Sequence, residues 1–253
     1  MPSLFICHGS PMMAIQHTPY TASLAEIGRQ FQPKAIVIFT AHWESSVTTI
    51  SFVEGIYETM YDFGGFDPEL YRINYPARGL PVVAELVEQR LEAAGIRTNR
   101  DAVRGLDHGA WVVLRKIFPD ASIPVVQVSV NPYLSPREQF EIGAALRDLG
   151  NQEIMVIGSG GTSHNLRNIK WGQIEPEPWT VAFDDWLLEG AAHKDYEKLF
   201  EYETLAPHAR LAVPRAEHFV PFYIAMGAGK SSTTKVWHRS YEFGTLSLIS
   251  LEF

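Results

Sequence analysis

Short apolar runs rich in β-branched residues alternate along this chain with segments whose apolar residues recur at helical spacing. The apolar runs predict strands at residues 4–7, 35–39, 47–53, 123–130 and 153–157, and a weaker one at 247–251. Such alternation is typical of a sheet that is covered by helices on both faces. We therefore predict an α/β fold of three layers, a single domain whose central sheet is mostly parallel or mixed.

The segments between the expected strands carry helix signals. Expected helices lie at residues 24–31, 81–94, 136–150, 179–189 and 218–226. The second stops at Gly95, which suits the left-handed position after a helix, and the third follows the capping box Ser135-Pro136-Arg137-Glu138. Residues 54–76 differ, because six aromatic residues lie there among glycines and prolines without a regular period. We expect an irregular aromatic loop of the kind that covers a site built on a sheet.

The composition narrows the classes of partner and compartment. Of the 253 residues, 46% are hydrophobic and 20% charged, which is ordinary for a globular protein with a full core. The net charge is -8 and no basic stripe is present, so nucleic acid and anionic membrane are not expected partners. Cys7 is the single cysteine, no apolar run approaches the roughly 20 residues of a membrane span, and the first residues lack the features of a signal peptide. We expect a cytoplasmic protein.

Three of the nine histidines follow expected strands. His8 comes directly after residues 4–7, His42 shortly after 35–39, and His164 after the glycine-rich run 158–163 that follows 153–157. The carboxyl ends of parallel strands meet at one edge of a sheet, where ligands bind. Neutral imidazole is a ligand for Fe, Zn, Cu and Ni, and a catalytic ion needs about three protein ligands and an open position. The positions of these histidines therefore predict a metal site at that edge.

The other histidines are less distinctive by themselves. His108 lies in a turn that enters an expected helix, and His218 follows Glu217 at the start of another. From the residues alone, each is either a site residue or a capping or solvated histidine. Histidines without a strand-end or glycine-rich setting, for which we predict surface positions, are His17, His193, His208 and His238.

The sequence gives little support for a structural zinc site, a serine hydrolase or a phosphate-binding loop. No paired C-x-x-C is present, which removes most structural zinc designs, and no G-x-S-x-G elbow marks a serine hydrolase. The run Gly158-Ser159-Gly160-Gly161 lacks the endings of the phosphate-binding loops. A histidine metal site remains the best interpretation of the residues.

At these residues the sequence resembles the class III extradiol dioxygenases, and most closely their DOPA 4,5-dioxygenase-like branch. The resemblance is carried, in the family's order, by residues 8–11 (HGSP), 40–43 (TAHW), 61–66 (YDFGGF), 106–109 (LDHG), 158–165 (GSGGTSHN) and 217–219 (EHF). These segments extend over nearly the whole chain. The resemblance implies one catalytic domain over residues 1–253 with one mononuclear metal, which is Fe(II) when the enzyme is active, while zinc occupies the site in some relatives.

The resemblance also implies roles for the metal-binding residues. His8 and His42 correspond to two metal ligands. The third ligand is a glutamate in one branch of the family, and here the Glu217-His218 order favours His218. His164 corresponds to a residue that is an acid–base group in one branch and reaches the metal in the other. We expect a mixed role for His164, as a fourth metal contact in the resting enzyme that turns to serve the substrate.

The implied reaction is the insertion of O2 into a catechol-type, DOPA-like ring to give a ring-opened semialdehyde. His108 corresponds to a residue that handles a substrate hydroxyl. Trp43, Tyr61 and Phe63 are predicted walls of an aromatic pocket, with ordinary core packing as the alternative. The expected partners are a small aromatic diol and O2, and the oligomeric state stays open.

An alternative hypothesis keeps the scaffold and changes the chemistry. Imidazole sites accept Zn(II) as well as Fe(II). The chain is then a zinc-binding protein that is either hydrolytic or only ligand-binding.

Overall fold

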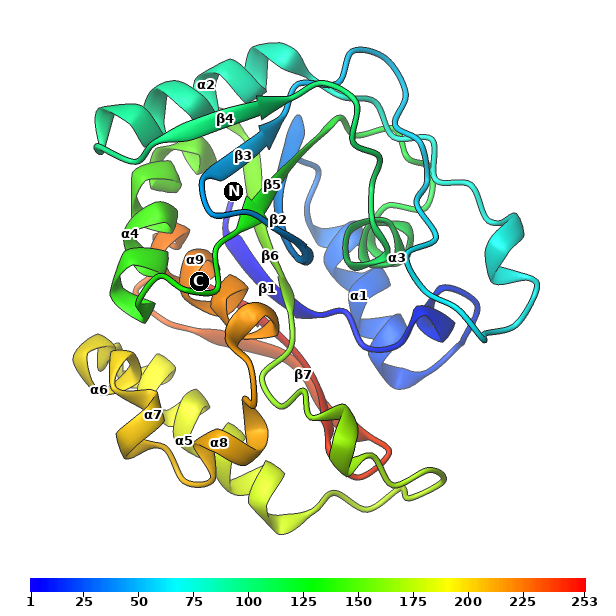
Figure 1. The fold of residues 1–253 in the computed structure, drawn as a ribbon, viewed down its shortest axis with the longest axis vertical. Coiled ribbons are helices and arrows are strands. Elements are labelled where there is room, and N and C mark those ends of the chain that lie inside the picture. The colour runs from blue at the N-terminus through cyan, green and yellow to red at the C-terminus, as the bar shows by residue number, and fades with distance from the viewer.

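One eight-stranded mixed sheet runs through the computed structural model, which describes residues 1–253 (Figure 1). Its strands are β1 (Ser3–Cys7), β2 (Ala35–Glu44), β3 (Thr48–Ser51), β4 (Thr98–Asp101), β5 (Val125–Val130), β6 (Ile154–Gly160), β7 (Lys235–Glu242) and β8 (Leu246–Glu252). They lie in the order β4-β3-β5-β2-β6-β1-β8-β7. The central strands β5, β2, β6 and β1 are parallel, whereas β3, β8 and β7 each have an antiparallel neighbour. The mixed sheet that the sequence pattern allows is confirmed.

The helices that match sequence predictions are α1 (Pro19–Gln30), α2 (Pro81–Ala93), α3 (His108–Ile117), α4 (Pro136–Leu146), α5 (Pro178–His193) and α9 (Val220–Ala228). The expected end signals are present. Ser135 and Glu138 form the capping box of α4, and Gly95, with φ of 77°, closes α2. None of the helices is both long and apolar enough to cross a membrane.

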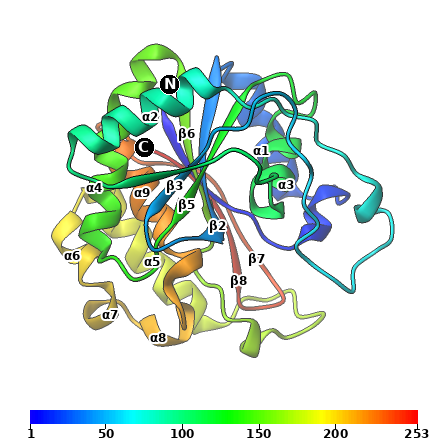
Figure 2. The same ribbon diagram turned by 45° about the horizontal axis from the view of Figure 1, so that its top comes forward.

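Side chains of the central strands point alternately to the two faces of the sheet, because successive residues of a strand face opposite ways. On β1, Leu4 and Ile6 belong to the core beneath α1 and α3, whereas Phe5 and Cys7 pack with α5 and α9. The helices α2 and α4 cover β2 and β5 on this second face. Figure 2 shows α1 and α3 on one side of the sheet and α2, α4 and α9 on the other. The predicted three-layer arrangement is therefore confirmed.

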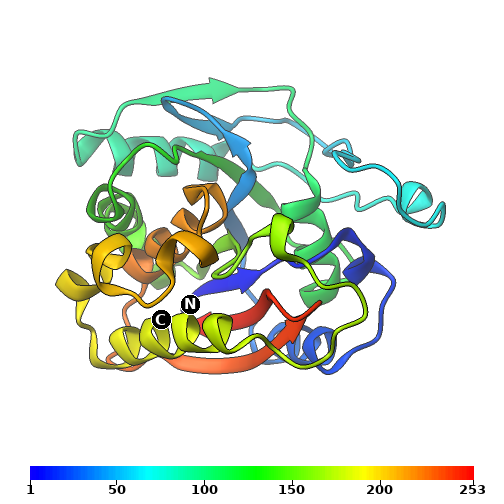
Figure 3. The ribbon, with the colours of Figure 1, turned by 60° about the horizontal axis from the view of Figure 1, so that its bottom comes forward.

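The elements that the sequence pattern missed are edge strands and short helices. β4 has the polar sequence TNRD, and β7 is exposed or half-buried along its length. The helices α6 (Tyr196–Phe200), α7 (Tyr202–Leu205) and α8 (Ala209–Ala212) are too short to show a helical period. Residues 54–76 form the expected irregular segment, interrupted only by the 3-10 turn Leu70–Arg72. Figure 3 shows this segment, in light blue to cyan, extending to one side of the sheet.

Of the three histidines predicted to follow strands, one lies within a strand instead. His8 follows β1, but His42 lies within β2, which continues to Glu44. The pairing of β2 with β6 ends at Thr40, so His42 lies where β2 extends beyond this neighbour. His164 comes after the end of β6, and His218 closes the 3-10 turn Ala216–His218 that precedes α9. All of these residues nevertheless lie at the edge of the sheet where the parallel strands have their carboxyl ends.

Candidate metal centre

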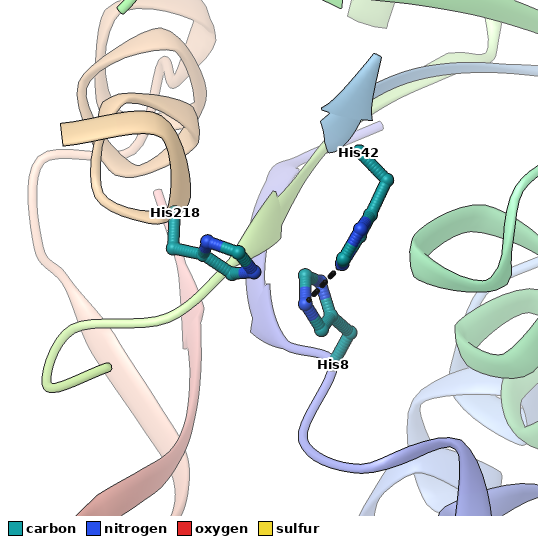
Figure 4. A group of neighbouring side chains, drawn as sticks. All are labelled: His8, His42 and His218. Carbon is teal, nitrogen blue, oxygen red and sulfur yellow. Dashed lines mark hydrogen bonds between the residues drawn. The ribbon is translucent and has the colours of Figure 1, made fainter. Parts of the chain in front are cut away.

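Three histidines from distant parts of the chain point toward one another (Figure 4). His8 follows β1, His42 lies on β2 and His218 precedes α9. One ring nitrogen of each lies within 4.8 Å of a ring nitrogen of the other two. The Nε2 atoms of His8 and His42 are 3.1 Å apart. This spacing suits two ligands that are each about 2.0–2.1 Å from a common ion.

The second ring nitrogen of each of these histidines faces an oxygen atom. Ser159 donates its hydroxyl proton to the carbonyl of Gly109 at 2.5 Å, so its oxygen accepts from Nδ1 of His8 at 3.1 Å. Glu217 accepts from Nδ1 of His218 at 3.0 Å. A carboxylate oxygen of Asp62 lies 3.6 Å from Nδ1 of His42. These oxygens favour the tautomer with a proton on Nδ1, which leaves the Nε2 lone pair for a metal.

The protonation of the cluster also suits a metal ion. Burial, together with the charges of neighbouring imidazoles, holds the pKa of His8 and His42 well below the usual 6.5. Both rings are therefore neutral near neutral pH, as metal binding requires. Nε2 of His218 is buried and has no hydrogen-bond partner. A buried, unpaired nitrogen that faces two others is the arrangement expected of a ligand set.

His108 begins α3 beside this cluster. The preceding residue, Asp107, caps the helix and accepts hydrogen bonds from Thr40 at 2.8 Å and from Gln127 at 3.1 Å, which tie α3 to β2 and β5. A Cβ on Gly109 would lie 2.5 Å from the hydroxyl of Thr40, so only glycine allows this approach. The Leu-Asp-His-Gly motif thus holds the His108 ring at the edge of the sheet.

Asp62 of the aromatic loop connects His42 and His108. Its Oδ1 accepts the backbone N–H of His108 at 2.9 Å and lies 3.1 Å from Nδ1 of the same residue. Its Oδ2 is the oxygen that faces His42. Burial alone would raise the pKa of Asp62, but the contacts with His108 lower it to about 2. Asp62 is therefore an anion that faces both imidazoles.

His164 lies against His218 and outside the group formed by His8, His42 and His218. The rings of His164 and His218 stack face to face, with centroids 3.6 Å apart and planes 8° from parallel. The backbone N–H of His164 donates to Ala212 at 3.0 Å. Burial and the charge of His218 lower the pKa of His164 to about 3. His164 is thus a neutral base next to the cluster.

The glycine-rich run that precedes His164 allows a close backbone approach. A Cβ at Gly158 would lie 2.1 Å from the carbonyl oxygen of Pro221, and a Cβ at Gly160 would lie 2.0 Å from that of His218. The N–H of Gly161 donates to the same His218 carbonyl at 2.7 Å. The glycines therefore position His218 and are explained without a bound phosphate.

A cavity of about 630 Å³ opens onto the histidines. The side chains of His8, His42, His108, His164 and His218 all line it. Its apolar walls include Phe63, Phe66, Leu166, Ile169, Trp171, Phe243 and Leu246. Its size and lining are those of a small-molecule site.

Of the predicted aromatic walls, Phe63 lines this cavity, whereas Trp43 and Tyr61 lie outside its lining. Trp43 follows His42 on β2 and therefore faces the other side of the strand, where it is buried beneath Arg104. Tyr61 is 38% exposed. Its hydroxyl donates to the backbone of Ile73.

The remaining histidines lie away from the cavity lining. Their side chains do not belong to any of the possible metal-binding groups. Those exposed as predicted are His17, His193 and His208, whereas His238 is half-buried on β7.

Comparison with known proteins identifies the family of this chain. Residues 2–253 match the family described as the catalytic LigB subunit of aromatic ring-opening dioxygenase. The 4,5-DOPA dioxygenase extradiol of Beta vulgaris is 38% identical over 99% of this chain and 96% of that protein. The protein of the same name from Escherichia coli is 35% identical over 100% of this chain and 94% of that protein. This chain belongs to the extradiol ring-cleaving dioxygenases.

A solved structure confirms the fold of the dioxygenase. The crystal structure of an uncharacterised protein from Escherichia coli superposes with a TM-score of 0.84, at 31% identity, over 100% of this chain and 99% of that one. The family resemblance and the ring-cleaving activity expected from the motifs are thereby confirmed. The family is metal-dependent, and the group formed by His8, His42 and His218 is one of three adjoining groups in this dioxygenase that could hold a metal ion.

Sequence reasoning did not assign Asp62 and Ser159, although both lie inside the motifs that carried the resemblance. Asp62 follows Tyr61 in the aromatic loop, and Ser159 lies in the glycine-rich run. Their contacts with His42 and His8 join segments that are far apart in the sequence. An acidic residue between two aromatic residues of a loop predicted to cover the site is the signal that could have indicated Asp62.

Asp62→Asn is expected to weaken metal binding by about 10–100-fold, the usual cost of losing a group that orients a metal ligand. The amide keeps a similar size but loses the charge that favours protonation of Nδ1 on His42. Titration with Zn(II) or Fe(II), with metal quantified per chain, measures this effect. Asp67→Asn is the matched control, because Asp67 lies in the same loop and the only hydrogen bond of its side chain is with the backbone of Glu69. Wild-type metal affinity in Asp62→Asn would contradict the positioning role.

Proposed function

We propose that this dioxygenase uses Fe(II), held by His8, His42 and His218, to insert O2 into a catechol-type, DOPA-like ring and release a ring-opened semialdehyde. The observation that carries the proposal is the convergence of these imidazoles at the floor of an aromatic-walled cavity. The relatives named 4,5-DOPA dioxygenase extradiol support the class of substrate.

The ligand set suits this chemistry. Three protein nitrogens leave positions on an ion for further ligands. Fe(II) bound there would hold the catechol oxygens and O2 side by side and relay electrons between them. The same imidazoles also accept Zn(II), which has no redox chemistry, so the zinc form is expected to bind substrate without cleaving it.

A proton must leave the catechol when its hydroxyls become ligands, and His108 is placed to receive it. The ring of His108 lines the cavity at 5.7 Å, centroid to centroid, from His8 and at 4.0 Å from His42. The carboxylate of Asp62 beside it stabilises the imidazolium that results. Proton acceptance at His108 thus needs no movement of the surrounding chain.

His164 is proposed to accept the proton of the second catechol hydroxyl and to return it later in the reaction. The lone pairs of an imidazole lie in its ring plane, and the planes of His164 and His218 are parallel with centroids 3.6 Å apart. An ion in the plane of one ring would therefore lie outside the plane of the other ring. This geometry disfavours an ion that is bound by both imidazoles. This arrangement supports the proton-handling part of the mixed role expected for His164 over a fourth metal contact.

The walls of the cavity orient the ring. Phe63 and Phe66 of the aromatic loop and Trp171 and Phe243 on the hairpin side line the same cavity as the histidines. Aromatic side chains bind a flat ring by stacking and edge contacts and exclude water from the reacting atoms.

Anaerobic reconstitution with Fe(II), followed by O2 and a panel of catechols, is expected to give O2 uptake and a yellow ring-opened product, and reconstitution with Zn(II) is expected to give neither.

His42→Ala is expected to lose the metal and the activity because it removes one buried nitrogen from the cluster, while circular dichroism stays that of a folded protein. His17→Ala is the matched control, since His17 is exposed and outside the cluster. Full metal content and turnover in His42→Ala would exclude this residue as a ligand.

His218→Ala and Glu217→Gln test the identity of the third ligand. His218→Ala is expected to abolish metal binding, because Nε2 of His218 is the unpaired nitrogen of the cluster. Glu217→Gln is expected to retain the metal with an affinity lowered by no more than about 10–100-fold, because Glu217 faces Nδ1 of His218 and not the Nε2 atom that faces the cluster. Metal content by elemental analysis decides between them. The reverse result would make Glu217 the ligand, as in the carboxylate branch of the family.

His164→Asn is expected to keep Fe(II) and to lower kcat by roughly 10²–10⁴-fold, the usual worth of a general acid or base. His108→Ala is expected to keep the metal and to raise KM or lower kcat. Metal content and steady-state kinetics, measured on the same preparations, separate proton handling from ligation. Loss of metal in His164→Asn would favour the fourth-ligand role, and unchanged turnover would remove His164 from the mechanism.

A further inference from the structure

The cavity above the histidines contains one carboxylate, that of Glu242, and no lysine or arginine. Glu242 is the last residue of β7. Its side chain forms no hydrogen bond or ion pair with another residue, and burial is the sole cause that raises its pKa. A partly buried carboxylate without a partner is costly, so a cation that binds beside it is favoured.

The pairing of the β7–β8 hairpin shows which way Glu242 faces. Glu242 lies opposite Leu246, and Ser240 lies opposite Leu248. Directly opposed residues, and residues two apart on one strand, share a face of the sheet. Leu246 lines the histidine cavity, and Ser240 and Leu248 line a second hollow of about 270 Å³. The carboxylate of Glu242 therefore faces the same side as both hollows.

The two hollows adjoin one another. Both are lined by Gly9, Ser10, Gln16 and Glu242, so Glu242 lies where they meet. The second hollow, like the first, has no basic side chain in its lining. A ring bound at the histidines can therefore extend a substituent past Glu242 into the second hollow, where an anionic group finds no positive partner.

We propose that Glu242 determines the specificity of this dioxygenase by binding an ammonium group on a short side chain of the catechol, with the second hollow accommodating that side chain. The inference rests on the proposed catechol cleavage and narrows its substrate to catechols whose side chain carries a net positive charge. A cationic catecholamine is favoured over a zwitterionic amino acid such as DOPA, because the carboxylate of the amino acid gains no partner. A catechol with an anionic side chain is the poorest substrate.

Substrates whose side chains match in length and differ in charge test this order. Dopamine, DOPA and dihydrocaffeate carry side chains of similar length with different charges, and methylcatechol is neutral. With the Fe(II) enzyme, kcat/KM from O2 uptake is expected to fall in the order dopamine, DOPA, dihydrocaffeate. Glu242→Gln is expected to lower kcat/KM for dopamine by about 5- to 50-fold, the range between an exposed and a buried ion pair, and to raise it for dihydrocaffeate. For methylcatechol it is expected to stay within about twofold, because that side chain makes no ion pair.

Glu175→Gln is the matched control, because it removes the same charge from an exposed position outside both hollows. It is expected to leave the substrate order unchanged. An equal loss for dopamine and methylcatechol in Glu242→Gln, or no preference between dopamine and dihydrocaffeate in the wild type, would overturn the assignment.

Binding without turnover separates this inference from the proposed function. Phenethylamine and hydrocinnamate have no catechol hydroxyls and differ in charge, so calorimetry reports the preference of the cavity even if no catechol is cleaved. The wild type is expected to bind phenethylamine more tightly, and Glu242→Gln is expected to lose that preference. Failure of every catechol in the series to be cleaved would contradict the catechol reaction alone, whereas equal binding of the two probes by the wild type would contradict the role of Glu242.

Discussion

The histidine cluster depends on how closely β6 approaches the turn that precedes α9. A Cβ at Gly160 would lie 2.0 Å from the carbonyl oxygen of His218, a distance that no side-chain carbon can occupy. The N–H of Gly161 donates to that same carbonyl, so the contact also directs the backbone. Any larger residue at Gly160 would force the turn away from β6. The close approach therefore brings a residue from the C-terminal part of the chain to the ends of β1 and β2.

Burial and charge work together around the cluster. Burial keeps His8 and His42 neutral by lowering their pKa, which leaves their lone pairs for a metal instead of a proton. Asp62 and Glu217, the carboxylates that face His42 and His218, both have lowered pKa values because contacts with the histidines outweigh the effect of burial. Two anions behind neutral ligands offset the charge of a divalent ion inside a cavity with apolar walls.

The fold places the histidine cluster and the apolar walls of the cavity on different elements. The metal cluster is held by the central strands and by the turn before α9, which are buried on both faces. The apolar walls of the cavity come from residues 54–76, from residues 166–171 and from the β7–β8 hairpin, all outside the central strands. Segments at the periphery tolerate sequence change better than buried strands do. Substrate preference can therefore vary among relatives while the histidine cluster stays in place.

The sequence by itself determined the parts of the fold that have a local period or a local end signal. The central strands, the capping box at Ser135 and the turn at Gly95 depend on residues close together in the chain, whereas the exposed edge strands β4 and β7 lack an apolar period and were missed. The strand-end histidines could likewise be found by position, and the family by its motifs. Only the tertiary structure decided the partners of those histidines and the charge of the cavity. Asp62 and Ser159 contact histidines that are far from them in the sequence, and Glu242 reaches the same cavity from the C-terminal hairpin. No periodicity or local motif records which distant side chain will face which imidazole or line the cavity.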